Sequence, residues 1–281
     1  MVDGKVLAAR FAGAADFETR KVISGGNELE IFFLDGLTSG RDIADFIVQP
    51  LHEARQDERE ETLFTRAERG LVWCASMKKA SSTDEAAELL VNGFCVILFP
   101  KTGKALGCEV KTGEKRSPSA PEAENTVKGA KDAFTETLRT NTSLIRRHLR
   151  TPELRLEESV VGRRSLTKIT VCWVEGLTDP ELPARMKKRL GEIDIDGLLS
   201  PAAVEEYVTG SRKTAFPLLE FTERTDHFCQ GLLDGQVGLL VDGLPIGYLA
   251  PVSFGRLMRS PEDRATDYLS ASMLRILRYL A

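Results

Sequence analysis

The amino-acid sequence predicts an α/β protein in which an internal duplication gives two similar subdomains, each built on a mixed sheet. The first observation is a repeated pattern at residues 29–42 (LEIFFLDGLTSGRD) and 169–182 (ITVCWVEGLTDPEL). Both runs pass from an apolar strand through an acidic residue and Gly-Leu-Thr to a helix start. The second observation is spacing, because the helix-stop glycines Gly93 and Gly235 are 142 residues apart, close to the 140-residue offset of the pattern. Strands that alternate with helices and hairpins are typical of the α/β class.

The first copy is predicted over residues 1–112. A hairpin turns at Gly25-Gly26, and a helix then begins at Thr38 or Ser39. After a charged stretch come a strand at 71–78, a helix that begins at Thr83 and an apolar hairpin. The apolar face predicted for the first helix consists of Ile43, Phe46, Ile47 and Leu51.

The second copy is predicted over residues 151–265 and repeats this order. ESVVGRR and LTKITVCWVEG form a hairpin, and Thr178 and Asp179 open a helix with apolar residues at helical spacing. A short helix at 201–208, a strand at 216–221 and a helix from Thr225 follow. The final hairpin turns at Asp242-Gly243, residue types that favour a two-residue type I′ turn.

Two further segments lie outside the copies. Residues 113–129 are rich in Pro, Ser and charges, which predicts a linker. Residues 130–150 predict a basic connecting helix with Phe134, Leu138, Ile145 and Leu149 on one face and Arg139, Arg146, Arg147 and Arg150 on the other. Residues 266–281 predict an apolar C-terminal helix without a glycine cap, and we expect it to lead into a longer protein.

The composition is that of a globular chain with no general affinity for nucleic acid. The 281 residues carry a net charge of −4, which gives no attraction to nucleic acid or anionic lipid. The five cysteines include no CxxC pair, so we expect a reducing compartment and no disulfides. The longest apolar run, residues 94–99, is far shorter than the ~20 residues that span a bilayer.

Motifs of known chemistry are weak in this sequence. Ser76-Met-Lys-Lys79 matches S-x-x-K, but it lies in a predicted strand, whereas that catalytic serine begins a helix. The acidic run from Asp194 to Gly197 starts like a calcium loop, yet Ala203 stands where a bidentate Glu is needed. No phosphate-binding loop occurs, and the three histidines lack metal-ligand spacing. The sequence therefore predicts a protein without catalytic residues, metal or cofactor that is not an enzyme.

Two pairs of charged residues are candidates for binding. Asp35 and Glu175 occupy matched places at a strand end, where they either order the glycine turn or bind the amine of a ligand. Arg163 and Arg164 lie between two predicted strands, either as a solvated turn or as a contact to an acidic surface of the other copy or of a partner.

The middle of the chain resembles the A subunits of bacterial spore germinant receptors, the GerA family, which includes the related stage V sporulation protein AF. The resemblance covers roughly residues 27–281 and rests on LRTN with LIRR, GRRS before a strand, DIDG, FPLLEFTERTD and LLDGQVGLLVDGLP. The family pattern Arg-Gly-Pro-Arg-Glu before Phe-Thr-Glu is not kept, since residues 127–133 read VKGAKDA.

This resemblance implies a protein of the spore inner membrane whose N-terminal part faces the cytoplasm, or spore core. It implies B and C subunits as partners, a homo-oligomer of the full-length A subunit, and nutrient-triggered germination through a membrane ion path. The residues that we expect at interdomain or intersubunit contacts are Arg139, Asn141, Arg146, Arg163 and Arg164. The alternative is a module that binds a small-molecule nutrient between the two copies, with Asp35 and Glu175 as ligand-binding residues.

Overall fold

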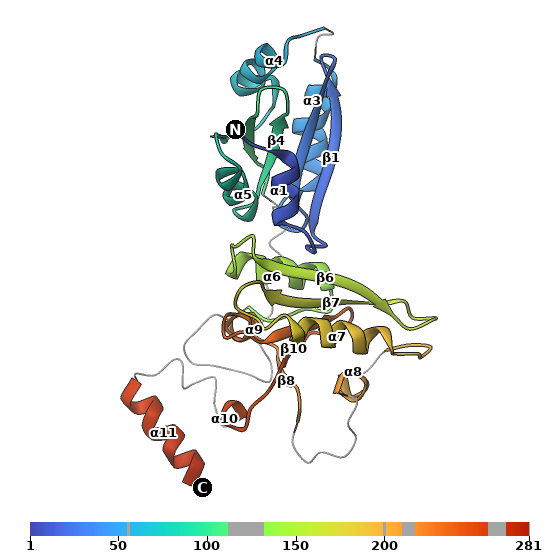
Figure 1. The fold of residues 1–281 in the computed structure, drawn as a ribbon, viewed down its shortest axis with the longest axis vertical. Coiled ribbons are helices and arrows are strands. Elements are labelled where there is room, and N and C mark those ends of the chain that lie inside the picture. The colour runs from blue at the N-terminus through green and yellow to red at the C-terminus, as the bar shows by residue number, and fades with distance from the viewer. Residues whose placement is uncertain (55–56, 112–131, 199–200, 210–216, 258–267, 281) are drawn as a thin grey trace. The chain divides into compact units, whose positions relative to one another are not determined.

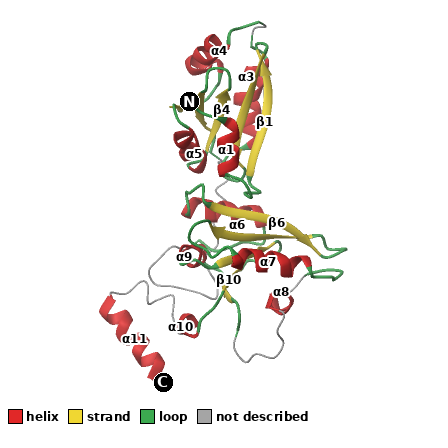
Figure 2. Ribbon diagram, in the orientation of Figure 1, coloured by secondary structure: helices red, strands yellow, loops and turns green. Residues whose placement is uncertain are grey.

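The computed structural model describes residues 1–54, 57–111, 132–198, 201–209, 217–257 and 268–280. The chain divides into two compact units: unit 1 is Met1–Lys115 with Leu149–Arg155, and unit 2 is Arg116–His148 with Leu156–Ala281. Each unit contains a five-stranded sheet with helices packed against it (Figure 1 and Figure 2). The predicted linker at residues 113–129 lies outside the described residues.

Unit 1 contains the first five strands of the chain, in the sheet order β1-β2-β4-β5-β3. Its elements are α1 (Gly4–Arg10), β1 (Phe17–Ser24), β2 (Asn27–Leu34), α2 (Gly40–Ile43), the π-helical turn η1 (Ala44–Val48), α3 (Gln49–His52), α4 (Glu60–Arg66), the π-helical turn η2 (Ala67–Leu71), β3 (Met77–Ala80), α5 (Thr83–Val91), β4 (Phe94–Phe99) and β5 (Lys104–Glu109).

Unit 2 repeats this sheet position by position, in the order β6-β7-β9-β10-β8. Its elements are α6 (Leu138–His148), β6 (Leu154–Val161), β7 (Thr167–Val174), α7 (Glu181–Gly191), α8 (Pro201–Thr209), β8 (Glu220–Thr222), α9 (Thr225–Leu233), β9 (Val237–Val241), β10 (Gly247–Ala250), α10 (Phe254–Leu257) and α11 (Tyr268–Leu280).

The register of the strands shows that the likeness holds residue by residue. Ile31 faces Ile97 across β2 and β4, and Val171 faces Leu239 across β7 and β9. The corresponding residues are 140 and 142 positions apart, the offsets of the repeated pattern and of the stop glycines. The 142-residue offset continues in the pairing of β5 with β3 and of β10 with β8. The predicted internal duplication is therefore confirmed.

The sheets differ from the prediction in strand direction. We predicted mixed sheets, because a helix that links two strands usually places them side by side and parallel. The pairs with a described register are antiparallel instead. The helix-linked strands β3 and β4 are separated by β5, and each pairs antiparallel with it. The two strands point the same way without being neighbours.

Helices cover both faces of the sheet in unit 1, because successive side chains of a strand point to opposite faces. Phe32 of β2 belongs to the apolar core beneath α1 and α5, whereas the adjacent Ile31 belongs to the core beneath α2, α3 and α4. In unit 2, Val171 and Leu239 lie in the core beneath α7 and α8. On the other side of that sheet, α9 packs against β7, β9 and β10.

The helix predicted at 130–150 is shorter than expected and belongs to the second copy. It begins at Leu138, because the preceding segment is extended and Ala133 forms a β-bridge with Arg224. Asp242 then caps the helix by accepting a hydrogen bond from the Leu138 N–H at 3.0 Å. α6 precedes β6 and packs against α9, just as α1 precedes β1 and packs against α5. The helix is therefore the first element of the second repeat.

The predicted two-residue type I′ turn is absent, because it requires positive φ at both central residues and, of Asp242 and Gly243, only Gly243 has it. Strands β9 and β10 are joined by residues 242–246 instead of a two-residue turn. The loop is held at the start of α6, since the Gly243 N–H donates to the Glu136 carbonyl at 2.8 Å. Asp242 and Gly243 still form a β-turn within this loop, since the Leu244 N–H donates to the Val241 carbonyl at 3.2 Å.

The helical segment made of α2, η1 and α3 departs from α-geometry ahead of Pro50. Proline has no N–H to donate to the carbonyl of Phe46, four residues earlier, and this carbonyl accepts from the Trp73 N–H at 3.0 Å instead. The helix widens into η1 at this point. Phe46 is 41% exposed, so it does not lie on the apolar face that we predicted. The buried residues of that face are Ile43, Ile47 and Leu51.

Two predicted strands are shorter than expected. The strand predicted at 71–78 begins at Met77, because the backbone N–H of Trp73 donates to Phe46 of η1 and not to the sheet. The strand predicted at 216–221 is β8 alone, and residue 216 lies outside the described residues. The charged stretch after His52 forms α4, a helix that the sequence pattern did not reveal.

Candidate functional site

Two sequence motifs lie against each other in unit 2, GRRS at residues 162–165 and DIDG at 194–197. The backbone N–H of Arg163 donates to the Ile195 carbonyl at 2.9 Å, and that of Arg164 donates to the Asp196 carbonyl at 2.8 Å. Main-chain hydrogen bonds thus fix the turn between β6 and β7 on the loop that follows α7. We call these eight residues the GRRS–DIDG tip.

The charged side chains of the GRRS–DIDG tip pair with one another. Arg163 donates to Asp194 at 2.7 Å, and the Arg164 Nε lies 3.6 Å from an Asp196 carboxylate oxygen. The four side chains are between 70% and 84% exposed. Exposed ion pairs contribute little to stability, so these arginines can exchange partners at small cost. The DIDG loop supplies an acidic surface within the same unit, and a contact to another copy or subunit stays a prediction.

The three candidate residues on α6 lie in different environments. Arg139 is exposed, whereas Asn141 is fully buried and Arg146 is 1% exposed. The Asn141 side chain accepts from the Thr135 N–H at 2.8 Å and donates to the Thr135 carbonyl at 2.6 Å. Asn141 therefore holds the extended segment before α6. Arg146 lies inside unit 2 and not on the basic face that helical periodicity predicted.

A polar cluster beside α9 was missed by sequence reasoning. The Asp132 carboxylate accepts from the Thr225 hydroxyl at 2.6 Å and from His148 at 2.7 Å. Burial alone would raise the pKa of this carboxyl, but the hydrogen bonds from Thr225 and His148 outweigh it, and the pKa of Asp132 is lowered. A carboxylate with a lowered pKa is a poor general base, which favours a structural role. No local spacing reveals the cluster, because Asp132 and Thr225 are 93 residues apart.

Asp35 and Glu175 occupy matching places, each directly after the second strand of its own unit. Asp35 is partly buried and its N–H donates to the Asp16 carbonyl at 2.7 Å, whereas Glu175 is exposed. Beside them, Thr38 and Thr178 close the two turns with backbone hydrogen bonds to the last strand residue, at 3.2 and 3.0 Å. This geometry supports the interpretation that each acidic residue belongs to an ordered turn. A ligand between the two copies stays a prediction.

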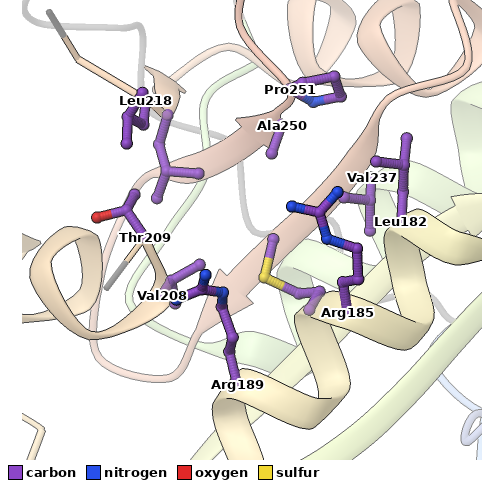
Figure 3. Close-up of a pocket in the computed structure, with 11 residues that line it drawn as sticks. Leu182, Arg185, Arg189, Val208, Thr209, Leu218, Val237, Ala250 and Pro251 are labelled. Atoms are coloured by element: carbon purple, nitrogen blue, oxygen red, sulfur yellow. The ribbon is translucent and has the colours of Figure 1, made fainter. Parts of the chain in front are cut away.

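Figure 3 shows an apolar pocket in unit 2, with a cavity volume of about 240 Å³. It is bounded by α7, α8 and the strand end at Ala250, and the side chains of Arg185 and Arg189 extend from α7 into it (Figure 3). The sequence pattern identified only the buried face of α7. The pocket was missed because its walls come from segments far apart in the chain.

The other residues considered for catalysis or metal binding are Ser76, the cysteines and the metal-ligating side chains. Ser76 directly precedes the edge strand β3 and starts no helix. The five cysteines are free thiols. Among the described residues, no three His, Cys, Asp or Glu side chains are grouped so that they could hold a metal ion.

Comparison with known proteins identifies the family. Residues 5–281 match the family described as Bacillus/Clostridium GerA spore germination protein. The chain belongs to the GerA family. The resemblance noted from GRRS, DIDG and the neighbouring motifs is therefore confirmed. Relatives of this chain include spore germination proteins XA and KA, which supports a role in spore germination.

Relatives and a solved structure agree with this assignment. The uncharacterized membrane protein YfkQ of Bacillus subtilis (strain 168) is 30% identical over 89% of this chain and 48% of its own length. Spore germination protein XA of Bacillus anthracis is 34% identical over 72% of this chain and 41% of its own length. The crystal structure of the N-terminal domain of the A subunit of the Bacillus megaterium spore germinant receptor GerK3 has a TM-score of 0.68 at 25% identity, and the match covers 89% of this chain and 93% of that one.

This GerA-family chain spans about half the length of the curated relatives that it matches. Within the described part of the chain, none of the helices has the length and apolar character required to cross a bilayer.

Proposed function

We propose that this chain is the N-terminal domain of a germinant receptor A subunit and that it acts in nutrient-triggered germination. The observation that carries the proposal is its likeness to the corresponding domain of the GerK3 A subunit, which is matched over 93% of its length. In this role the chain assembles with B and C subunits and with further copies of the A subunit. It passes a signal to an ion path in the membrane.

In this proposal the rest of the protein lies in the spore inner membrane and this domain lies on its cytoplasmic, or core, side. The printed name of the relative YfkQ, a membrane protein, supports a membrane location. The last described helix, α11, also carries a group of exposed apolar side chains, which a soluble monomer rarely presents. These side chains are Leu269, Met273, Leu274, Ile276, Leu277 and Tyr279.

Within this role, the GRRS–DIDG tip is the surface that we assign to subunit contact. Its arginines are exposed, and the planar guanidinium group suits the carboxylates of a partner. Arg139 on α6 is a second exposed candidate. Asn141 and Arg146 would act indirectly, because both are buried within unit 2, and Asn141 also holds the segment that precedes α6.

The test uses the full-length gene in its native spore-forming host, with germination followed as the nutrient-triggered fall in optical density of spores. Arg163→Glu breaks the pair with Asp194 and reverses the charge offered to a partner. The swapped variant Arg163→Glu/Asp194→Arg restores the internal pair but still presents altered charges to a partner. If the tip contacts another subunit, both variants germinate poorly at normal receptor levels.

The control is Arg20→Glu, at an exposed arginine of β1, and we expect it to germinate normally. Rescue by the swapped pair would show that Arg163 acts only within its own unit and would remove the contact proposal. The proposed role in nutrient-triggered germination has a separate test. Deletion of the gene should abolish the response to at least one nutrient. An unchanged response to every nutrient would contradict it.

A further inference from the structure

The pocket in unit 2 has an apolar interior of limited size. Its buried side chains are all hydrophobic, and their exposed fractions are 6% or less: Met186, Val208, Leu219 and Val237. The cavity volume of about 240 Å³ is below the ~300–1,000 Å³ of pockets that hold drug-sized ligands. The space is therefore suited to one aromatic ring or one branched aliphatic chain.

Two cationic side chains lie at this apolar space. Arg185 and Arg189 are four residues apart on α7, so they project from the same face of the helix. Their side chains extend toward Val208, Thr209 and Ala250 (Figure 3). The wall residues and the arginines thus offer an apolar surface and two guanidinium groups to the same small volume.

The arginines of the pocket lack counter-ions within the described part of the chain, unlike Lys187 on the same helix. Lys187, on the opposite face of α7, pairs with Glu157 at 2.7 Å and stacks on Trp173. No acidic residue is among those described as lining the pocket, and neither Arg185 nor Arg189 has an ion pair with a described residue. The pocket is therefore complementary to an anion with an apolar body.

We propose that this pocket binds a small carboxylic acid with an aromatic or branched aliphatic body. The body would lie against Val208, Leu219 and Val237, where its burial removes apolar surface from water. The carboxylate would accept hydrogen bonds from the guanidinium groups of Arg185 and Arg189, which match carboxylate geometry. This binding activity goes beyond the proposed assembly role and does not depend on it.

The test measures binding to the 281-residue chain by isothermal titration calorimetry, with 3-phenylpropanoate as the probe. The neutral isostere 3-phenylpropanamide has the same ring and chain but no charge. We expect the acid to bind at least about tenfold more tightly than the amide, a difference of about 1.4 kcal/mol. We also expect the affinity for the acid to fall as salt increases, because an exposed ion pair is screened.

Variants locate the site. Arg185→Gln and Arg189→Gln each remove one guanidinium group at an exposed position, and each should weaken binding of the acid at least about fivefold while leaving the amide unaffected. Lys187→Gln, on the opposite face of the same helix, should leave both affinities unchanged. The proposal is overturned if the acid does not bind at 10 mM, if acid and amide bind equally, or if both arginine variants bind like the unmodified chain.

Discussion

In unit 2 the backbone of Gly235 lies against the carbonyl oxygen of Leu177, which is 3.0 Å from the position that a Cβ would occupy. Gly93 has the same relation to the Leu37 carbonyl in unit 1, at 3.5 Å. The helix-stop glycine and the Gly-Leu-Thr turn, which are separate signals in the sequence, therefore form one packing arrangement. The duplication preserves this arrangement in both units.

We expect Gly235→Ala to destabilise the protein more than glycine conformation alone explains. Gly235 has φ +86° and Gly243 has φ +85°, but nothing lies within 4 Å of a Cβ at Gly243. Gly243→Ala should cost about 1–2 kcal/mol from backbone strain. Gly235→Ala should cost at least about 1 kcal/mol more, because its Cβ meets the Leu177 carbonyl. Urea unfolding followed by circular dichroism measures both, and equal losses would contradict the packing argument.

The features predicted correctly from the sequence are local ones. The stop glycines and helix starts are set by residues close in the chain, so they could be recognised without knowing the fold. The strand order was not recognisable, because nothing in the sequence of β3 and β4 shows that β5 lies between them. The equivalence of α6 and α1 could not be recognised, because their N-terminal caps come from different parts of the chain. Asp3, directly before α1, caps that helix, whereas the distant Asp242 caps α6.

At the candidate site, too, local features could be predicted from the sequence and contacts between distant residues could not. GRRS and DIDG were each noted, but their contact joins residues about 30 positions apart and follows from the fold. Helical periodicity placed Arg146 on a solvent face, yet neighbouring elements bury it. Periodicity identifies the two sides of a helix but does not show how many sides the rest of the protein covers.

Asn141→Ala should lower the free energy of unfolding by about 1–3 kcal/mol, because it leaves the partly buried N–H and carbonyl of Thr135 without their partner. Asn92 is the matched control. Its side chain also donates to a backbone carbonyl, at 2.8 Å from Asn92 to Glu88, but this side chain is exposed. Asn92→Ala should change stability by less than about 0.5 kcal/mol. Chemical denaturation of the two variants makes the comparison, and a loss at Asn141 no larger than at Asn92 would argue against the bridging role.

The lowered pKa of Asp132 predicts a pH-dependent contribution to stability. The folded-state pKa lies below the unfolded value of about 3.9, so the ionised carboxylate stabilises the fold. This contribution is complete above about pH 3.9 and is lost as the pH falls through the folded-state pKa. Asp132→Asn should therefore be less stable than the unmodified chain at pH 7, and the difference should shrink below about pH 3.9. Unfolding curves between pH 7 and pH 3 test this, with Asp194→Asn at the exposed tip as the control. A stability difference that does not change with pH would contradict the argument.

The cysteines of unit 1 predict a selective thiol reaction. Cys74 is half-buried, and a hydrogen bond with Cys108 lowers the pKa of its thiol despite partial burial. The pKa of the Cys108 thiol is raised by the same hydrogen bond and by burial. Burial also raises the pKa of Cys95, and that of Cys229 to about 12. Because the thiolate is the reactive form, the Cys74 thiol should react faster than the thiols of the other cysteines.

At pH 8 we therefore expect one of the five thiols of the folded chain to react rapidly with Ellman's reagent, and all five to react after unfolding in guanidinium. Cys74→Ser should abolish the rapid phase, whereas Cys229→Ser should leave it intact, because Cys229 is buried and its thiol stays protonated. Alkylation followed by peptide mass spectrometry identifies the labelled residue. A rapid phase that persists in Cys74→Ser would show that exposure and the hydrogen bond to Cys108 do not control reactivity in this fold.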